Sequence, residues 1–165
     1  AFRDPASLGG DALTAAERWQ GGGGVPLDWP VADADAYDVV FDALLGTGLD
    51  REPAGAYAEA IDAINHAEAF VVAVDIPSGL QADTGVALGA TTVADLTVTF
   101  IGNKRGLFTA DGPDHAGDIV FDKLETPDSI RDSEPDSGIL IQEEIILGML
   151  PPRLLKNTPS AQSCQ

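Results

Sequence analysis

Two aspartates stand where apolar stretches of the sequence end, and both could take part in proton transfer or cation binding. Asp42 lies near the end of the stretch Tyr37–Leu45, and Asp75 directly follows the continuous apolar run Phe70–Val74. A carboxylate in such a position is costly to bury unless it meets a cation or hydrogen-bond donors. Asp75 could therefore orient a substrate hydroxyl or move a proton. The alternative for Asp42 is a helix cap or a partly exposed strand end, and for Asp75 it is capping of the following turn.

Glycine and serine accompany these aspartates. Gly46 and Gly48 follow Asp42 and permit positive φ and close approach of a ligand to the backbone, although any tight turn could use them. Ser78 lies in the sequence Asp-Ile-Pro-Ser-Gly and adds a hydroxyl. No Gly-x-Ser-x-Gly elbow surrounds Ser78, so a hydrolase nucleophile is rejected.

A third polar loop contains Lys104 and Arg105, the only adjacent basic pair in a very acidic chain. Gly102 and Gly106 flank the pair, and a phosphate contact would suit that setting. The alternative is a solvent-exposed turn that carries two charges.

The elements that would position these loops alternate between strand and helix. The pattern predicts a helix over Gly10–Gln20, a strand and turn over Tyr37–Leu45, a helix over Ala54–His66, and strands over Phe70–Val74, Val93–Ile101 and Asp118–Phe121. The Phe70–Val74 run is typical of a strand buried on both faces. Strand, helix, strand with short connections implies right-handed crossovers and a parallel sheet of the doubly wound α/β class. Because ligands bind outside the carboxyl ends of such strands, we expect Asp42, Asp75 and Lys104 to gather around one crevice.

Composition narrows the class of protein. The length of 165 residues suits one domain, and a hydrophobic content of 44% argues against disorder. The net charge of −18 disfavours nucleic acid and anionic membrane surfaces as partners. No apolar run is long enough to span a membrane or to form a signal peptide, so we expect a cytoplasmic protein. One cysteine and two separated histidines, His66 and His115, make structural zinc unexpected.

Three segments contain the polar loops described above, namely DALLGTGL, then VVAVDIPSGLQADTG, then LTVTFIGNKRGL with HAGDIVFD after it. Together they resemble the signatures of the NAD(P)H-hydrate epimerase (YjeF N-terminal domain) family. Their order and spacing also match, over roughly Gly10–Phe121. The resemblance implies a Rossmann-like three-layer fold with a mainly parallel sheet. It also implies an isomerase that interconverts the R and S forms of hydrated NADH and NADPH, abbreviated NAD(P)HX, which carry a hydroxyl on the reduced nicotinamide ring.

The resemblance also implies roles for individual residues. Asp42 and Ser78 would supply oxygen ligands to a potassium ion, and Asp75 would contact the substrate. Oxygen-only donors suit a hard cation of this kind. Asp75 is our first candidate for the proton-transferring group, and Lys104 is the second. The residues expected to line the hydrated nucleotide are Gly46, Thr47, Gly48, Leu49, Asp50, Arg51 and Glu52.

The sequence departs from the family pattern in one respect that shapes the expected domain organisation. The family's Asn-Asn-Gly-Gly-Asp-Gly loop, which grips phosphates and adds a potassium ligand, is absent. We therefore expect residues 1–125 to be an epimerase domain without its N-terminal portion. Residues 126–137 read as a linker, and residues 138–165 read as the start of a truncated domain that resembles a fused ADP- or ATP-dependent dehydratase.

Two other interpretations stay open. One is a non-catalytic YjeF-type module that binds a nucleotide or acts as a scaffold, which the missing loop favours. The other is an unrelated doubly wound protein that binds a different nucleotide, for which the three matching segments would be coincidence. The activity of this chain in its present form and its assembly into a homo-oligomer are left open by the sequence.

Overall fold

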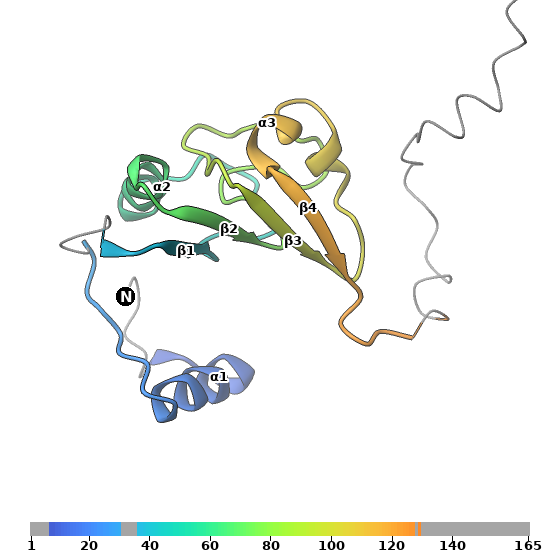
Figure 1. The fold of residues 1–165 in the computed structure, drawn as a ribbon. Helices are drawn as coiled ribbons and strands as arrows, with labels where there is room; N and C mark the ends of the chain where they lie inside the picture. Colours follow the sequence, from blue (N-terminus) through green and yellow to red (C-terminus); the bar gives the residue numbers. More distant parts are fainter. Residues whose placement is uncertain (1–6, 31–35, 128, 130–165) are drawn as a thin grey trace, which may run out of the picture. The chain divides into compact units, whose positions relative to one another are not determined.

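The computed structural model describes residues 7–30, 36–127 and 129 of the chain. The chain divides into two compact units, Ala1–Pro135 and Asp136–Gln165, and every element described below belongs to the first. In chain order the elements are α1 (Gly10–Gly21), β1 (Val39–Asp42), α2 (Ala56–His66), β2 (Phe70–Val74), β3 (Leu96–Phe100), the 3-10 turn η3 (Arg105–Phe108), α3 (Gly112–Ala116) and β4 (Asp118–Asp122) (Figure 1). The predicted second domain over residues 138–165 and nearly all of the predicted linker lie outside the described residues.

The four strands form one sheet in the order β1-β2-β3-β4, and every neighbouring pair is parallel. This confirms the predicted parallel sheet and the Rossmann-like α/β class. The strand order follows the chain order without reversal, and parallel crossovers are right-handed. The three connections therefore lie on the same face of the sheet.

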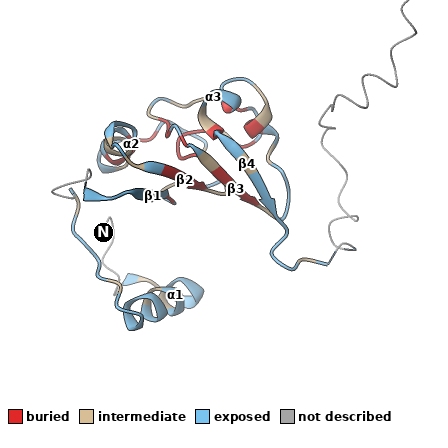
Figure 2. Cartoon of the chain, in the orientation of Figure 1, coloured by how far each residue is buried: buried red, intermediate tan, exposed pale blue. Residues whose placement is uncertain are grey.

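Burial of the strands follows from this one-sided covering. Four side chains that share a face with Asp42 are buried, namely Val71, Ala73, Thr97 and Thr99, while Phe121 at the edge of that face is exposed. On the opposite face Val39, Phe41, Phe70 and Val120 are exposed apolar residues of the described part of the chain. Figure 2 shows the buried positions concentrated in β2, β3 and the loops beside α3. The prediction that Phe70–Val74 is buried on both faces is therefore wrong for Phe70, which is 50% exposed, and holds for Val71–Ala73.

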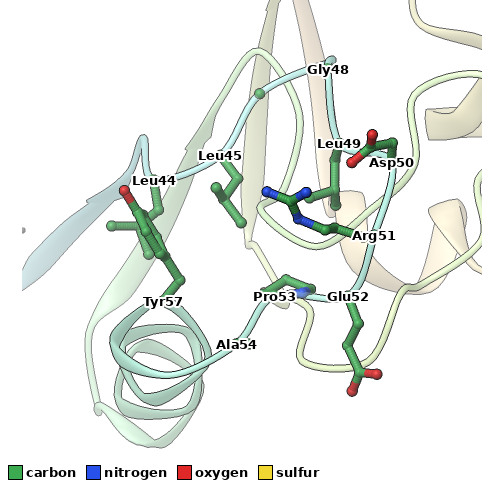
Figure 3. A pocket seen from close by; sticks show the side chains of 11 residues that line it. Leu44, Leu45, Gly48, Leu49, Asp50, Arg51, Glu52, Pro53, Ala54 and Tyr57 are labelled. Carbon is green, nitrogen blue, oxygen red and sulfur yellow. The ribbon is translucent and has the colours of Figure 1, made fainter.

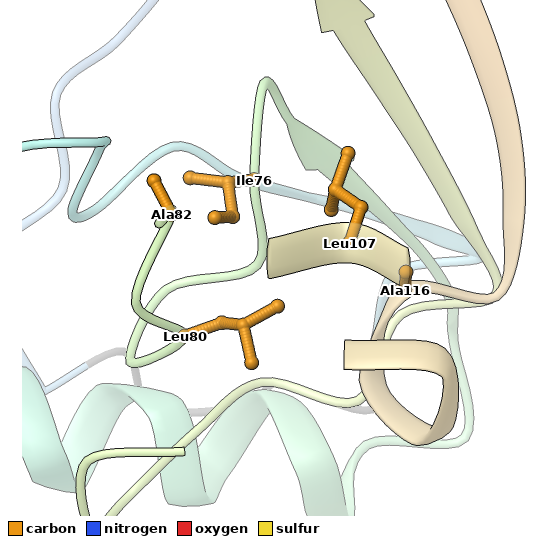
Figure 4. Close-up of a cluster of buried hydrophobic side chains, with 5 residues drawn as sticks. All are labelled: Ile76, Leu80, Ala82, Leu107 and Ala116. Atoms are coloured by element: carbon orange, nitrogen blue, oxygen red, sulfur yellow. The ribbon is translucent and has the colours of Figure 1, made fainter. Parts of the chain in front are cut away.

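The larger apolar cluster lies in the loops rather than within the sheet. Ile76, Leu80 and Ala82 follow β2 and pack with Leu107 of η3 and Ala116 of α3 (Figure 4). Apolar burial of this kind is the main stabilising contribution available to a loop. The segment after β2 is therefore fixed by packing at both of its ends, and the polar residues within it have defined positions.

The predicted boundaries agree with the structure to within a few residues, except at β3. The predicted strand began at Val93, whereas β3 begins at Leu96. The amide of Thr92 donates to the carbonyl of Ser78 at 2.8 Å, and that of Ala94 donates to the carbonyl of His115 at 2.9 Å. Because these amides donate to loop carbonyls, the chain pairs with the neighbouring strands only from Leu96 onward.

The helix α1 ends at Gly21, where the glycine run was predicted to end it, and it contains no buried residue. Among the residues that the structure describes, no helix has both the length and the apolar content needed to cross a bilayer.

Candidate functional site

Asp42 and Ser78 form a buried hydrogen-bond network where β1 ends. The hydroxyl of Ser78 donates to Asp42 Oδ1 at 2.7 Å, and its amide donates to Asp42 Oδ2 at 2.8 Å. The amide of Leu44 also approaches Asp42 Oδ1, at 3.3 Å. Asp42 is 0% exposed and Ser78 is 1% exposed. In the described part of the chain no cationic side chain pairs with Asp42, so neutral donors alone surround this carboxylate.

The Asp-Ile-Pro-Ser-Gly turn places Ser78 beside β1. The amide of Leu80 closes the turn by donating to the carbonyl of Pro77 at 3.1 Å. Gly79 has φ of 95°, and a Cβ at this position would overlap the carbonyl of Ala90 and the side chain of Thr91. Only glycine fits this left-handed, crowded backbone position. Gly79 therefore sets the direction of the turn, and the turn places the side chain of Ser78 in a buried position.

Asp75 and Lys104 form an ion pair where β2 and β3 end. The ammonium of Lys104 donates to Asp75 Oδ1 and, at 2.8 Å, to the carbonyl of Phe100. Asp75 Oδ1 also accepts the amide of Phe100 at 3.0 Å and the hydroxyl of Thr99 at 3.4 Å. The side chains of Lys104 and Asp75 are 17% and 28% exposed, so the pair is shielded without being closed off.

The backbone of Asp75 is itself unusual, because its φ is 73°. A non-glycine residue in the left-handed region is uncommon and costs about 1 kcal/mol or more, and Asp75 shares this conformation with Ile101, Ala110, Leu124 and Glu125. The amide of Asp75 donates to the carbonyl of Val98 at 2.8 Å, which holds the residue in this conformation at the sheet edge. The conformation turns the carboxylate toward the end of β3.

The structure places the two members of the basic pair, Lys104 and Arg105, in different surroundings. Lys104 is not in a solvent-exposed turn, because its ammonium faces Asp75 and the end of β3. Arg105 is exposed, and its Nε donates to the carbonyl of Asp83 at 2.6 Å.

A pocket of about 500 Å³ opens at the loop after β1 (Figure 3). Its walls contain the predicted substrate-binding residues Gly46, Gly48, Leu49, Asp50, Arg51 and Glu52, but not Thr47. Asp42, Ser78, Asp75 and Lys104 are not among the residues that line it. The described residues thus bring Asp42 to Ser78 and Asp75 to Lys104, while the pocket is formed by the loop after β1 and the start of α2.

Sequence reasoning missed five of the eleven residues that line the pocket. Five further lining residues, most of them apolar, flank the predicted loop, namely Leu44, Leu45, Pro53, Ala54 and Tyr57. The nearest available signal was the apolar and aromatic content on both sides of the Gly-Thr-Gly sequence, which is typical of ligand pockets.

Leu45 joins the pocket to the buried network. It lines the pocket, while its backbone amide donates to the hydroxyl of Ser78 at 2.9 Å. Its carbonyl lies 3.2 Å from the same hydroxyl. A change at Asp42 or Ser78 would therefore be transmitted directly to the pocket wall.

No cluster of three or more histidine, cysteine, aspartate or glutamate side chains with metal-binding geometry occurs within residues 7–30 and 36–127. His66 is exposed and its Nδ1 lies 2.6 Å from the carbonyl of Asp62, while Nδ1 of His115 lies 3.0 Å from the carbonyl of Thr92. Both histidines thus contact backbone carbonyls.

Comparison with known proteins places this arrangement in a family. Residues 2–106 match the model of the YjeF-related protein N-terminus. An NAD(P)H-hydrate epimerase of Limosilactobacillus reuteri is 52% identical over 96 residues, which cover 58% of this chain and 45% of the relative. The bifunctional NAD(P)H-hydrate repair enzymes Nnr of Escherichia coli and Coxiella burnetii are 43% and 39% identical, and the matches cover 22% and 24% of their lengths. The chain thus spans about half the length of the epimerase relative and about a quarter of the bifunctional ones. The match over residues 2–106 includes both carboxylate sites and the pocket, and on this evidence the chain belongs to the YjeF-related protein N-terminus family.

Proposed function

We propose that this protein takes part in nicotinamide-cofactor repair, as an isomerase that interconverts the R and S forms of NAD(P)HX. The names of the relatives support this activity. The observation that carries the proposal is the ion pair of Asp75 and Lys104, held by a left-handed backbone where two parallel strands end. Ligands of open parallel sheets bind outside that edge.

In the proposed reaction Asp75 is the proton-transferring residue. In the reactive form Asp75 carries a proton on Oδ2 while Lys104 donates to Oδ1, and this carboxyl group protonates the ring hydroxyl. The carbon–oxygen bond then breaks, the oxygen leaves as water, and Asp75 becomes a carboxylate while the ring nitrogen shares the positive charge left on the ring carbon. Water then adds to the opposite face of the ring carbon and returns a proton to Asp75. The step is neutral overall, and general acid–base catalysis of this kind contributes typically 10²- to 10⁴-fold in rate.

Lys104 would act through Asp75 as a positioning residue. Its ammonium and the amide of Phe100 both donate to Asp75 Oδ1, so that oxygen is fixed. In the described structure the other carboxylate oxygen, Oδ2, has no recorded hydrogen bond, and it is the atom we propose for proton transfer.

The pocket would hold the nucleotide. Residues 46–52 and Asp75 are the proposed substrate contacts, including Thr47, which neighbours the lining residues Gly46 and Gly48. The glycines leave the backbone open to close approach of a ligand, and the apolar walls suit a flat ring.

Asp42 and Ser78 are the residues we propose for a potassium ion. They fit such an ion in kind, because a carboxylate, a hydroxyl and the carbonyl of Leu45 bring three oxygen donors together. The buried carboxylate also has no cationic side chain beside it in the described residues, and burying such a charge is costly. A bound cation would supply a fixed positive charge next to the pocket wall.

For the rest of the protein we propose an epimerase domain over residues 1–125 and a linker over 126–137. Residues 138–165 would begin an ADP- or ATP-dependent dehydratase-like domain. The bifunctional relatives support the presence of a second domain. The proposed site of action is the cytoplasm.

The decisive experiment mixes the chain with (R)-NADHX and follows formation of the S form by chromatography. We expect conversion that is faster than the spontaneous rate and is lost in Asp75→Asn. Nucleotide binding without conversion would replace the epimerase with the non-catalytic module. A chain that neither binds nor converts the hydrate would sink both.

A further inference from the structure

The surface of the described structure carries an excess of negative charge that ion pairs do not offset. Every acidic residue of the described chain except Asp42 and Asp75 is exposed. Asp75 is also the only one of these acidic residues with a recorded ion pair. The whole chain has 27 acidic residues against 9 lysines and arginines, which gives the net charge of −18. Repulsion among carboxylates therefore acts on this fold with little relief from neighbouring cations.

The imbalance of charge is greatest in the middle of the chain. Residues 52–103 contain no lysine or arginine, although acidic residues occur throughout this stretch. The stretch includes the whole of α2, β2 and β3. In α2 the exposed residues Glu59 and Asp62 lie three positions apart, and like charges at this spacing on a helix repel each other. Short-range repulsion within α2 thus adds to the long-range effect of the net charge.

Hydrogen bonds to the backbone account for only some of the exposed carboxylates. Asp95 Oδ2 accepts the amide of Val71 at 2.7 Å, and Asp111 Oδ2 accepts the amide of Ala87 at 2.9 Å. In the described structure, by contrast, the acidic side chains of α1 and α2 accept no recorded hydrogen bond. Exposed acidic residues occur in α1, in α2, in β4 and in the loops, so their effect belongs to the surface as a whole rather than to one site.

We infer that this protein functions at high ionic strength and depends on dissolved salt for its stability. Folding brings the carboxylates together, because a compact domain has roughly half the dimensions of its unfolded chain. The range of charge repulsion falls from about 10 Å at 0.1 M salt to about 3 Å at 1 M. Salt therefore lowers the free energy of the folded chain more than that of the unfolded chain. This effect requires no particular residue to hold an ion, so it is independent of the proposed potassium site and of the proposed activity.

The test measures thermal unfolding of the 165-residue chain by circular dichroism, in KCl and in NaCl. We expect the midpoint temperature to rise by roughly 5–15 °C between about 0.05 M and about 2 M salt, and to rise alike for the two cations. Most of the rise should come below about 1 M, where the range of repulsion changes most. Asp42→Ala should show the same rise from its own starting midpoint, because the repulsion does not depend on that residue.

A pair of matched variants tests whether surface charge causes the rise. The first variant combines Glu59→Gln, Asp62→Asn and Glu68→Gln, which neutralises three exposed carboxylates. The second combines Glu59→Asp, Asp62→Glu and Glu68→Asp, which keeps all three charges. Removing three charges from a net charge of −18 lowers its square by roughly 30%, and repulsion follows that square. The salt-induced rise in midpoint should therefore shrink by roughly 30% in the neutralised variant and stay at the wild-type value in the charged one.

Three outcomes would overturn the inference. One is a wild-type midpoint that stays within about 2 °C over the whole range of salt. Another is a rise that occurs in KCl alone and is complete at millimolar concentrations, because a single potassium site would behave in that way. The third is an equal rise in the neutralised and charged variants, which would mean that salt acts by a route other than surface charge. None of these measurements involves turnover, so failure of the proposed epimerase activity would leave their results unchanged.

Discussion

Asp42 and Asp75 end neighbouring parallel strands, yet the fold gives them opposite surroundings. Asp42 is wholly buried and accepts only neutral donors from Ser78 and Leu44. Asp75 is 28% exposed, is paired with Lys104, and has a left-handed backbone. Buried carboxylates with satisfied hydrogen bonds define a local structure, whereas a partly accessible carboxylate on a constrained backbone can meet a substrate. On our proposals the carboxylate at the end of one strand thus binds a cation within a fixed network, and the carboxylate at the end of the next transfers a proton.

The largest expected effect is on turnover, in Asp75→Asn. The amide keeps the shape of the side chain but cannot donate and recover a proton. We expect epimerisation of (R)-NADHX to fall about 10²- to 10⁴-fold. The free energy of unfolding should change by only about 1 kcal/mol, because ion pairs with partial solvent access contribute little. The measurements are single-turnover rates and urea denaturation on the same preparations.

Lys104→Gln is the matched test of positioning. If Lys104 acts only by fixing Asp75, its loss should have little further effect in the Asp75→Asn background. Additive losses of rate in the double variant would instead make Lys104 a second catalytic residue. A wild-type rate in Asp75→Asn would remove Asp75 from the chemistry altogether.

The second prediction concerns stability, in Asp42→Ala. Removal of the carboxylate leaves the buried amide of Ser78 without its acceptor and the hydroxyl with only the carbonyl of Leu45, at 3.2 Å. We expect the free energy of unfolding to fall by roughly 2–4 kcal/mol, measured by urea denaturation. We expect a larger loss of stability in Asp42→Ala than in Asp75→Asn. Unfolding of Asp42→Ala at the same urea concentration as the wild type would contradict this.

Sequence reasoning succeeded where local pattern determines structure. The run Phe70–Val74 and the alternation of Thr and Val in Leu96–Phe100 are sufficient to predict two strands, and parallel topology then brings their ends to one edge. It failed where long-range contacts decide. Nothing local to Ser78 indicates that its hydroxyl reaches Asp42, 36 residues away, and nothing local to Glu52 indicates that its side chain lies against Gly89.

Long-range contacts also decide which loops share a cavity. For this reason the expected crevice around Asp42, Asp75 and Lys104 differs from the pocket that the structure forms. Three loops meeting at one edge followed from topology, but which of them line a common cavity depends on side-chain packing. Ile76 and Leu80 pack into the loop cluster with Leu107. The pocket lies instead between the loop after β1 and the N-terminal end of α2.

A smaller effect is expected for Ser78→Ala, which tests how the buried network supports the pocket. The change removes a donor to Asp42 and an acceptor for the amide of Leu45. We expect a loss of about 1–2 kcal/mol in the free energy of unfolding. Because Leu45 lines the pocket, affinity for the nucleotide should also fall, and titration would reveal it. Unchanged affinity despite lower stability would mean that the pocket wall is independent of the network.

The smallest expected effect concerns two neutral side chains. It tests whether a hydrogen-bond partner sets the free-energy cost of burying a polar group. Thr92 and Thr97 are both fully buried, but only the hydroxyl of Thr97 has a partner among the described residues, the carbonyl of Ala116 at 2.6 Å. Valine has nearly the shape of threonine, so the exchange isolates the hydroxyl. Thr97→Val should destabilise the protein by about 1 kcal/mol, whereas Thr92→Val should leave stability unchanged or raise it by about as much. If both variants lose stability equally in urea denaturation, the hydrogen-bond partner is not what sets the cost of burying a polar group in this fold. The neutral donors around Asp42 would then not offset the cost of burying its carboxylate, and the proposed cation would have to do so.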